Sequence, residues 1–220
     1  MNLQIKHLGI GDYDNVYHEM VEHTEKRDEN SPDSLWLVEH PPVFTQGRHG
    51  RAEHLINPHA IPVVQSDRGG QITYHGPGQA IIYFLLDLKH FSIGIKTLVC
   101  QIEKACMDLL ESYGIDSHLI DNAPGIYVQN KKIASLGLRV KKGRTYHGIA
   151  INTDMDLTPF SYINPCGYQG LKMTQIADFR DDIKVSDVFD DYSRCFVKRL
   201  KQASRIPSSL MRGGIISPLS

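Results

Sequence analysis

The chain has 220 residues, of which 41% are hydrophobic and 22% charged, and its formal net charge is -1. These proportions are ordinary for a globular protein, and the length suits one domain with a sizeable core. The near-neutral charge gives no broad basic field of the kind that binds nucleic acid. The longest apolar run, Ala80–Leu86, is far too short to span a bilayer. We therefore expect neither nucleic acid nor a membrane as a partner.

The first residues and the cysteines indicate the compartment. Residues 1–6 lack a basic segment followed by an apolar core, so nothing predicts export. The four cysteines form no Cys-x-x-Cys unit and no close pair, which argues against a disulfide framework and against a structural zinc site. We expect a cytoplasmic protein with free thiols, no metal and no cofactor.

The first third of the chain predicts one helix and several short strands. Apolar residues at helical spacing from Tyr13 predict a helix that ends near Lys26, with Asp12 as its cap. Strand-forming runs follow at residues 35–39, 43–47 and 63–66. The second of these follows a proline pair, so we expect it at a sheet edge.

The rest of the chain predicts an α+β fold. Residues 67–79 read as a polar, Gly-rich loop, and residues 79–87 as a strand buried on both faces. Residues 98–113 predict a helix that Gly114 stops. The remaining elements are a strand meander at 126–128, 132–140 and 146–152, and a last helix capped by Ser186. We expect a single domain over residues 1–220, with a mixed or antiparallel sheet flanked by helices and residues 204–220 as a loose tail.

Cys166 is the candidate nucleophile, because residues 164–167 read Asn-Pro-Cys-Gly, a turn rather than an apolar stripe. Proline fixes the backbone before the sulfur and glycine permits close approach after it, so the thiol can be presented to a ligand. Cys100, Cys106 and Cys195 lie in predicted helices, where buried thiols behave as small hydrophobes. A half-buried structural thiol is the alternative for Cys166.

A cysteine nucleophile needs a nearby cation, because the pKa of a free thiol is about 8.5 and the thiolate is the attacking form. Lys132 opens a predicted strand, and His147 precedes Gly148 and another strand. Both are candidates, and their spacing alone does not choose between them. A solvated turn lysine is the alternative for Lys132.

The loop at residues 67–79 is the candidate ligand-binding segment. It combines glycines with Arg68, Thr73, Tyr74 and His75, but neither phosphate-binding glycine pattern is present. The adjoining strand places an apolar wall beside the loop, which suits an acyl chain better than a sugar or a phosphate. A purely structural loop is the alternative.

Four segments together carry a resemblance to a known family: Arg68–Gln79, Lys132–Arg139, His147–Asn152 and Ile163–Gly167. In composition, order and spacing the chain resembles the lipoyl(octanoyl) transferase family from about Leu35 to Ile176. The resemblance implies the α+β fold of the biotin and lipoate protein ligase catalytic domains. A cysteine often found after the lysine-isoleucine pair in that family is alanine here, which removes an alternative nucleophile.

The resemblance also implies an activity and its partners. An octanoyl group would pass from octanoyl-acyl carrier protein to a lysine of a lipoyl domain, through a thioester on Cys166, and Lys132 would lower the pKa of that thiol. The acceptors would be the lipoyl domains of the E2 subunits of 2-oxoacid dehydrogenases and the H protein of glycine cleavage. The positions that match the family's substrate-binding segments are Arg68, Gly69, Gly70, Gln71, Ile72, Thr73, Tyr74, His75, Ser135, Leu136, Gly137, Gly148, Ile149 and Ala150. We expect His75 and His147 in the wall of the pocket or in the layer of residues directly behind it.

Three other functions stay open at this point. An ATP-dependent lipoate ligase of the same fold would need no cysteine, a non-catalytic carrier-binding module would need neither Cys166 nor Lys132, and a cysteine peptidase would need a histidine base.

A basic hairpin is the candidate docking surface for an acidic carrier protein. Its cationic residues are Lys131, Lys132, Arg139, Lys141, Lys142 and Arg144. Strand alternation lets only some of them share a face, and a solvated hairpin is the alternative.

Overall fold

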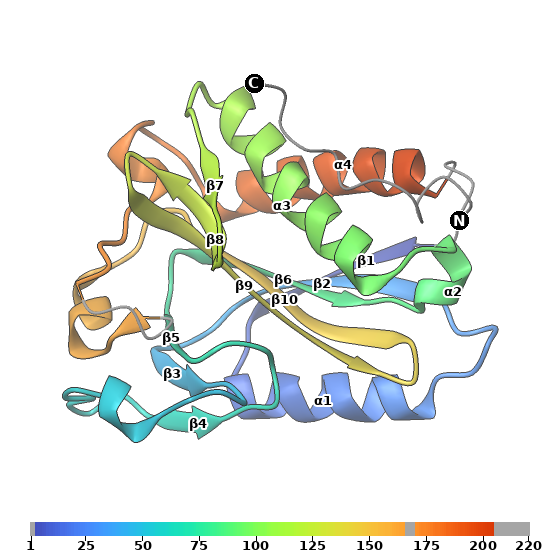
Figure 1. The fold of residues 1–220 in the computed structure, drawn as a ribbon, viewed down its shortest axis with the longest axis horizontal. Helices are drawn as coiled ribbons and strands as arrows, with labels where there is room; N and C mark the ends of the chain where they lie inside the picture. The colour runs from blue at the N-terminus through green and yellow to red at the C-terminus, as the bar shows by residue number, and fades with distance from the viewer. Residues whose placement is uncertain (1–2, 166–169, 205–220) are drawn as a thin grey trace.

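The computed structural model describes residues 3–165 and 170–204 (Figure 1). The helices are α1 (Tyr13–Lys26), α2 (Leu88–Phe91), α3 (Ile95–Ser112) and α4 (Val185–Ala203). The strands are β1 (Leu3–Ile10), β2 (Asp33–Glu39), β3 (Val43–Gln46), β4 (Val63–Gln65), β5 (Ile72–His75), β6 (Gln79–Leu85), β7 (His118–Ile120), β8 (Ala123–Val128), β9 (Lys131–Lys141) and β10 (Arg144–Asn152). No helix among the described residues is both long and apolar enough to cross a membrane.

The strands form a large sheet and a small one. Within the described residues the large sheet has seven strands in the order β1-β2-β6-β10-β9-β8-β7, and the small sheet has the order β4-β3-β5. In the large sheet β1 runs parallel to β2, and the other neighbouring strands are antiparallel. Helices α3 and α4 cover one face of the large sheet, and α1 lies on the other (Figure 1). The expected α+β class, a mixed sheet flanked by helices, is confirmed.

Strands β2 and β6 each carry a continuous apolar run, because helices cover both faces of the large sheet. On β2, Leu35 and Leu37 join the core under α3 and α4, whereas Trp36 and Val38 join the core under α1. Successive side chains of a strand point to opposite faces, so one continuous apolar run fills two separate cores. Strand β6 alternates in the same way and is buried along its whole length.

Most of the predicted elements are confirmed. Helix α1 begins after Asp12, whose side chain accepts a hydrogen bond from the amide of Asn15 at 3.1 Å. Helix α3 is followed by Gly114, which has the left-handed φ of +75° that commonly ends a helix. The predicted meander forms β8, β9 and β10.

Two predictions for the small sheet are wrong. Residues 43–47 do not form an edge, because β3 pairs with β4 on one side and β5 on the other. Residues 67–79 are not all loop, since Ile72–His75 form β5 and pair antiparallel with β3. The surrounding glycines and polar residues conceal a strand of only four residues in the sequence.

The prediction for the start of the last helix is also wrong. Helix α4 begins at Val185, and the carboxylate of Asp187 accepts a hydrogen bond from the amide of Lys184 at 3.3 Å, so Ser186 is not the cap. The edge strands β1 and β7 were not predicted, because most of their side chains are exposed and give no apolar alternation.

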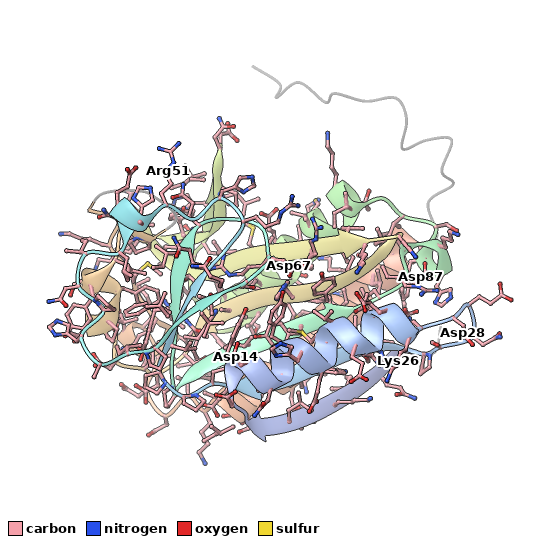
Figure 2. All side chains as sticks on the ribbon, turned by 90° about the horizontal axis from the view of Figure 1, so that it is seen from below. Asp14, Lys26, Asp28, Arg51, Asp67 and Asp87 are labelled. Atoms are coloured by element: carbon pink, nitrogen blue, oxygen red, sulfur yellow. The ribbon has the colours of Figure 1, made fainter. Side chains whose placement is uncertain are left out.

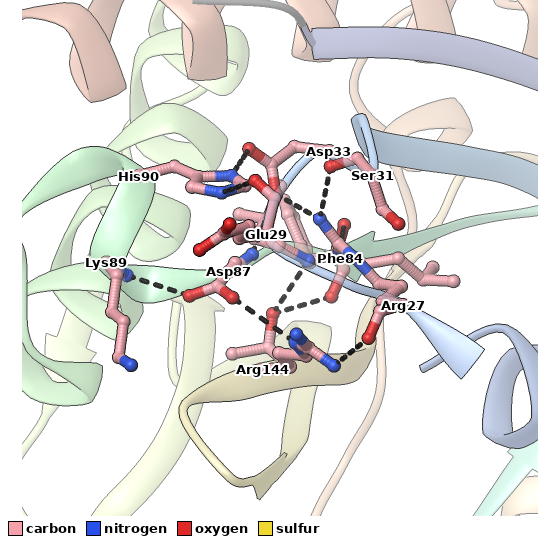
Figure 3. Close-up of polar contacts among 12 residues, drawn as sticks. Arg27, Glu29, Ser31, Asp33, Phe84, Asp87, Lys89, His90 and Arg144 are labelled. Carbon is pink, nitrogen blue, oxygen red and sulfur yellow. Dashed lines mark hydrogen bonds and ion pairs between the residues drawn. The ribbon is translucent and has the colours of Figure 1, made fainter. Parts of the chain in front are cut away.

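A buried polar network ties five elements together at one end of the large sheet (Figure 3). The guanidinium of Arg27 donates to the Asp33 carboxylate at 2.7 Å and to the Leu85 carbonyl at 2.6 Å. The same carboxylate accepts from the Asp87 amide at 2.7 Å and from the His90 ring at 2.9 Å. Arg27 and Asp33 side chains are 1% and 5% exposed, so their charges compensate one another away from water.

We predict that Asp33→Ala lowers the free energy of unfolding by about 3–5 kcal/mol, because it leaves the Arg27 guanidinium buried without its counter-charge. Urea unfolding measures this. Glu22→Ala, which removes an exposed pair with Lys26, serves as the control and should leave the midpoint unchanged. A loss at Asp33 no larger than that of the control would contradict the role of the buried pair.

We predict a pH-dependent contribution from His90. The hydrogen bond to Asp33 raises the pKa of His90, which means that the folded state favours the charged ring. A raised pKa contributes stability that is complete below the unfolded pKa of about 6.5 and is lost as the pH rises through the folded value. His90→Gln should therefore lower the melting temperature more at pH 5.5 than at pH 8.5. Equal losses at the two pH values would exclude the charged pair.

Candidate functional site

A mainly apolar cavity lies between the large sheet and the segment that leads into β5. It contains about 500 Å³ of atom-free space, including its open mouth. Its walls are Tyr13, Arg68, Gly70, Gln71, Ile72, Thr73, His75, Ile81, Tyr83, Ser135, Leu136, Gly137, His147, Gly148, Ile149 and Ala150. Twelve of the fourteen residues predicted to bind substrate therefore line one cavity, all except Gly69 and Tyr74.

The floor of the cavity is flat because small residues face one another across two strands. In the register of β9 and β10, Ser135 pairs with Ala150 and Gly137 pairs with Gly148. A Cβ atom on Gly137 would approach the Gly69 carbonyl oxygen to 2.7 Å, and one on Gly148 would overlap the carbonyl of the neighbouring strand β6. A larger residue at either glycine would therefore displace backbone rather than a flexible side chain.

Arg68 holds the roof of the cavity in place. Its buried guanidinium donates to the carbonyl oxygens of Thr45 at 2.5 Å, Gln71 at 2.7 Å and Gly69 at 2.9 Å. The Gly69 amide in turn donates to the Leu138 carbonyl on β9 at 3.1 Å. Because the side chain binds the loop's own carbonyls, the contribution of Arg68 to the site is to fix the loop shape.

His75 is a neutral ring in the cavity wall. Its Nδ1 lies 2.7 Å from Gln79 Oε1 and its Nε2 lies 3.3 Å from Thr45 Oγ1. Burial lowers the pKa of His75 to about 3, and the nearby charges of His40 and Arg68 act in the same direction. With both nitrogens engaged by protein groups, His75 offers a ligand the face or edge of its ring.

His147 has an unusual backbone that turns its ring to the cavity side. Its φ is +62°, in the left-handed region that strands rarely contain. The residue is 1% exposed, and Nε2 of its ring lies 2.8 Å from Oδ1 of Asp67, which is labelled in Figure 2. Among the described residues Nδ1 has no hydrogen-bond partner.

The protonation of this pair follows from the two pKa shifts. Burial lowers the pKa of His147 in spite of the hydrogen bond to Asp67. For Asp67, burial alone would raise the pKa, but hydrogen bonds from His147 and Tyr146 outweigh it and lower the pKa to about 2. At neutral pH the pair is therefore a carboxylate that accepts from a neutral imidazole, and Nδ1 presents a lone pair.

Lys132 is completely buried at the start of β9. Its amide donates to the Lys172 carbonyl at 2.9 Å, and its carbonyl accepts from the Thr174 amide at 3.0 Å. Its Nζ lies 5.5 Å from the centroid of the Tyr127 ring, within reach of a cation-π contact. Burial of a primary amine costs free energy unless its surroundings compensate, so the position is a candidate functional site.

Cys166 lies outside the described residues, and its prediction stays untested. Of the other thiols, Cys106 and Cys195 match their structural interpretation: burial raises the pKa of each, which disfavours the reactive thiolate. Within residues 3–165 and 170–204 no group of three His, Cys, Asp or Glu side chains could hold a metal ion.

The predicted basic docking surface is wrong as a single patch. Lys132 is buried, Arg139 lies 3.5 Å from Asp67, and Lys141 is paired with Glu25. The side chain of Arg144 is bound to Asp87 and to the backbone. Strand register separates these cations and acidic neighbours neutralise three of them, which the hairpin sequence alone does not reveal.

The sequence interpretation missed three residues of the cavity wall. Ile81 and Tyr83 alternate along the buried strand, and the face that they share with Ala150 could have been inferred from the pairing of β6 and β10. Tyr13 carries no local signal, because only the packing of α1 against β5 brings its ring to within 5.9 Å of the His75 ring.

Comparison with known proteins decides the family. Residues 13–197 match the lipoyl protein ligase A/B catalytic domain. The chain belongs to this family. An octanoyltransferase from Francisella tularensis subsp. novicida is 55% identical over 203 residues, which cover 92% of this chain and 98% of that protein. An octanoyltransferase from Shewanella amazonensis is 58% identical over 173 residues, or 79% and 80% of the two chains.

Solved structures share the fold at low sequence identity. A bipartite lipoate protein ligase from Thermoplasma acidophilum aligns with a TM-score of 0.72 at 15% identity, over 93% of this chain and 91% of that one. The biotin protein ligase from Aquifex aeolicus gives 0.58 at 15% identity, over 97% and 76%. The expected family, the ligase-like fold and the assignment as an acyltransferase enzyme are thereby confirmed.

We predict that Gly125→Ala displaces the Lys132 side chain. A Cβ atom there would overlap Lys132 Cε and approach the Ala134 carbonyl oxygen to 2.5 Å, and Gly125 has a φ of +127°. The expected result is a stability loss of about 1–3 kcal/mol from the backbone alone, together with lower turnover. Denaturant unfolding and an acyl-transfer assay measure the two effects.

The matched control for this prediction is Gly143→Ala. Gly143 has a φ of +81°, but no atom lies within 4 Å of the position that a Cβ would take, so the substitution adds backbone strain without contact. It should lower stability and leave turnover unchanged. Equal turnover in the two variants would show that the space at Gly125 does not serve Lys132.

Proposed function

We propose that the protein transfers an octanoyl group from octanoyl-acyl carrier protein to a specific lysine of lipoyl domains, through a thioester on Cys166. The observation that carries this proposal is the gathering of twelve predicted substrate residues around one apolar cavity, in a chain 55% identical to an octanoyltransferase. A cavity with an apolar majority and a few polar groups suits a short acyl chain.

The first half-reaction exchanges one thioester for another. The Cys166 thiolate attacks the carbonyl carbon of the octanoyl-carrier thioester, and the bond from that carbon to the carrier sulfur breaks. Lys132, as an ammonium, lowers the pKa of the Cys166 thiol and gives its proton to the departing carrier sulfur. The two thioesters are similar in energy, so no nucleotide is consumed.

The second half-reaction forms an amide. The amine of the acceptor lysine attacks the octanoyl carbonyl carbon, the bond to the Cys166 sulfur breaks, and Lys132, now neutral, accepts the proton that the amine loses. The amide is more stable than the thioester, which drives the transfer forward. One lysine thus serves as acid in the first step and base in the second.

Two anchored segments support the pairing of Cys166 with Lys132. Before residues 166–169, the Asn164 amide donates to the His54 carbonyl at 2.8 Å. After them, the backbone of residues 172–174 pairs with Lys132. The chain returns beside Lys132 soon after Cys166, which supports a thiol placed close to that lysine.

The cavity residues are proposed to bind the acyl group. Ser135, Gly137, Gly148 and Ala150 would form the floor under the chain, with the loop held by Arg68 as the roof. The proposed acceptors are the lipoyl domains of the E2 subunits of 2-oxoacid dehydrogenases and the H protein of glycine cleavage. An ATP-dependent lipoate ligase is the second candidate, because one structural relative is a lipoate-protein ligase A bound with ATP.

We predict that intact-protein mass spectrometry detects an octanoyl adduct on the wild-type chain after mixing with octanoyl-acyl carrier protein without ATP. Hydroxylamine and an apo lipoyl domain should each release it, because both attack a thioester. Cys166→Ser is the matched control and should give no adduct that hydroxylamine removes. Acylation of the lipoyl domain only with ATP and free octanoate would instead identify a ligase.

A further inference from the structure

A chain of hydrogen bonds runs through the interior from the roof of the cavity to the backbone of Lys132. It begins at the Arg68 guanidinium, whose Nε donates to Thr45 Oγ1 at 3.2 Å. It continues through His75, Gln79 and Asn152 and ends where the Thr174 amide donates to the Lys132 carbonyl. Its seven members are between 0% and 9% exposed.

The carbonyl oxygen of Thr174 fixes the direction of the chain from one end, because a carbonyl only accepts. Asn152 Nδ2 donates to it at 2.9 Å, which leaves Asn152 Oδ1 to accept from Gln79 Nε2 at 2.9 Å. Gln79 therefore presents Oε1 to the His75 ring at 2.7 Å, and His75 carries its proton on Nδ1.

Arg68 fixes the same direction from the other end, because a guanidinium only donates. Thr45 Oγ1 accepts from Arg68 and gives its own proton to Nε2 of His75, the nitrogen without hydrogen. Both ends thus require the same neutral tautomer of His75. No neutral side chain in this chain of hydrogen bonds can be flipped or ionised without leaving a buried donor or acceptor unpaired. An unpaired buried group costs more free energy than the hydrogen bond itself contributes.

The chain crosses five strands and joins the two parts of the proposed site. Thr45, His75, Gln79 and Asn152 lie on β3, β5, β6 and β10, and the last link reaches the segment that pairs with the start of β9. An apolar core would hold these strands together equally well, so packing alone does not account for a buried polar chain between Arg68 and Lys132.

We infer that Gln79 and Asn152 are positioning residues for octanoyl transfer, which hold Lys132 and residues 172–174 at a fixed distance from the acyl cavity. The inference rests on the proposed function, because it assigns Lys132 the proton transfers described above. Neither amide needs to touch the substrate. Their effect is to keep the Lys132 amine where the thiol and the acyl carbonyl meet.

The test is Asn152→Asp, which keeps the shape and the acceptor for Gln79 but turns a carboxylate oxygen toward the Thr174 carbonyl. We expect the rate of acyl-enzyme formation from octanoyl-acyl carrier protein to fall about 100-fold, the loss typical of small misplacements, with little change in KM. The pH profile of the rate at which iodoacetamide alkylates Cys166 should shift to higher pH. A purely structural role would not produce this change.

Gln46→Glu is the matched control, because it also converts a buried amide to a carboxylate but retains the oxygen that accepts from Gln65. It should leave the rate and the alkylation profile unchanged. If Asn152→Asp does not fold, Gln79→Met, which removes the donor to Asn152 at similar volume, takes its place with the same expected result. If Asn152→Asp does fold, Gln79→Met is measured alone and combined with it. If the two residues act as one chain, this double variant should be no slower than the slower single variant.

Folded variants with wild-type rate and alkylation profile, or additive losses in the double variant, would overturn the inference. Lys132→Met and Cys166→Ser are measured in the same assays. They distinguish failure of the positioning role from failure of the proposed function. If Lys132→Met shifts the alkylation profile and Asn152→Asp does not, only the positioning role is lost. If the alkylation profile shifts neither in Asn152→Asp or Gln79→Met nor in Lys132→Met, the role assigned to Lys132 is wrong. The inference is then wrong as well.

Discussion

The candidate site depends on the hydrogen bonds that the guanidinium of Arg68 donates. The guanidinium binds three carbonyl oxygens of the loop and of β3, and so gives a roof to a cavity whose floor is the large sheet. Its charge also suits the neutral state of His75, because a second cation beside it would be repelled. The shape of the roof and the protonation of the wall therefore have a common origin.

The two faces of the large sheet have different roles: one packs a core and the other borders the cavity. Under α3 and α4 the sheet carries the larger apolar core, which includes Phe84, Phe196 and Tyr192 and holds the strands in register. On the other face, glycine, alanine and serine in β9 and β10 leave room for a ligand. The small residues would destabilise an isolated sheet, but the core on the opposite face compensates for the packing that they forgo.

The fold itself does not choose between transfer and ligation. Lipoate and biotin protein ligases have the same arrangement at 15% identity, so likeness of structure extends to architecture alone. What distinguishes a thioester mechanism is a nucleophile beside a buried cation. Lys132 is fully buried and its backbone is paired with residues 172–174, which supports the proposal that it serves as that cation.

The sequence by itself determined the family, the α+β class, the main helices and most of the residues that line the cavity, because four motifs and clear apolar periods are local properties of the chain. Only the tertiary structure decided that Lys132 is buried, that Arg139 and Lys141 are paired with acidic residues, and that Tyr13 reaches the cavity. Burial and pairing depend on residues distant in the chain, such as Asp67, which no local pattern connects to its partners. The hydrogen-bonded chain from Arg68 to Lys132 joins residues from five strands for the same reason, and its direction follows from the geometry of its two ends.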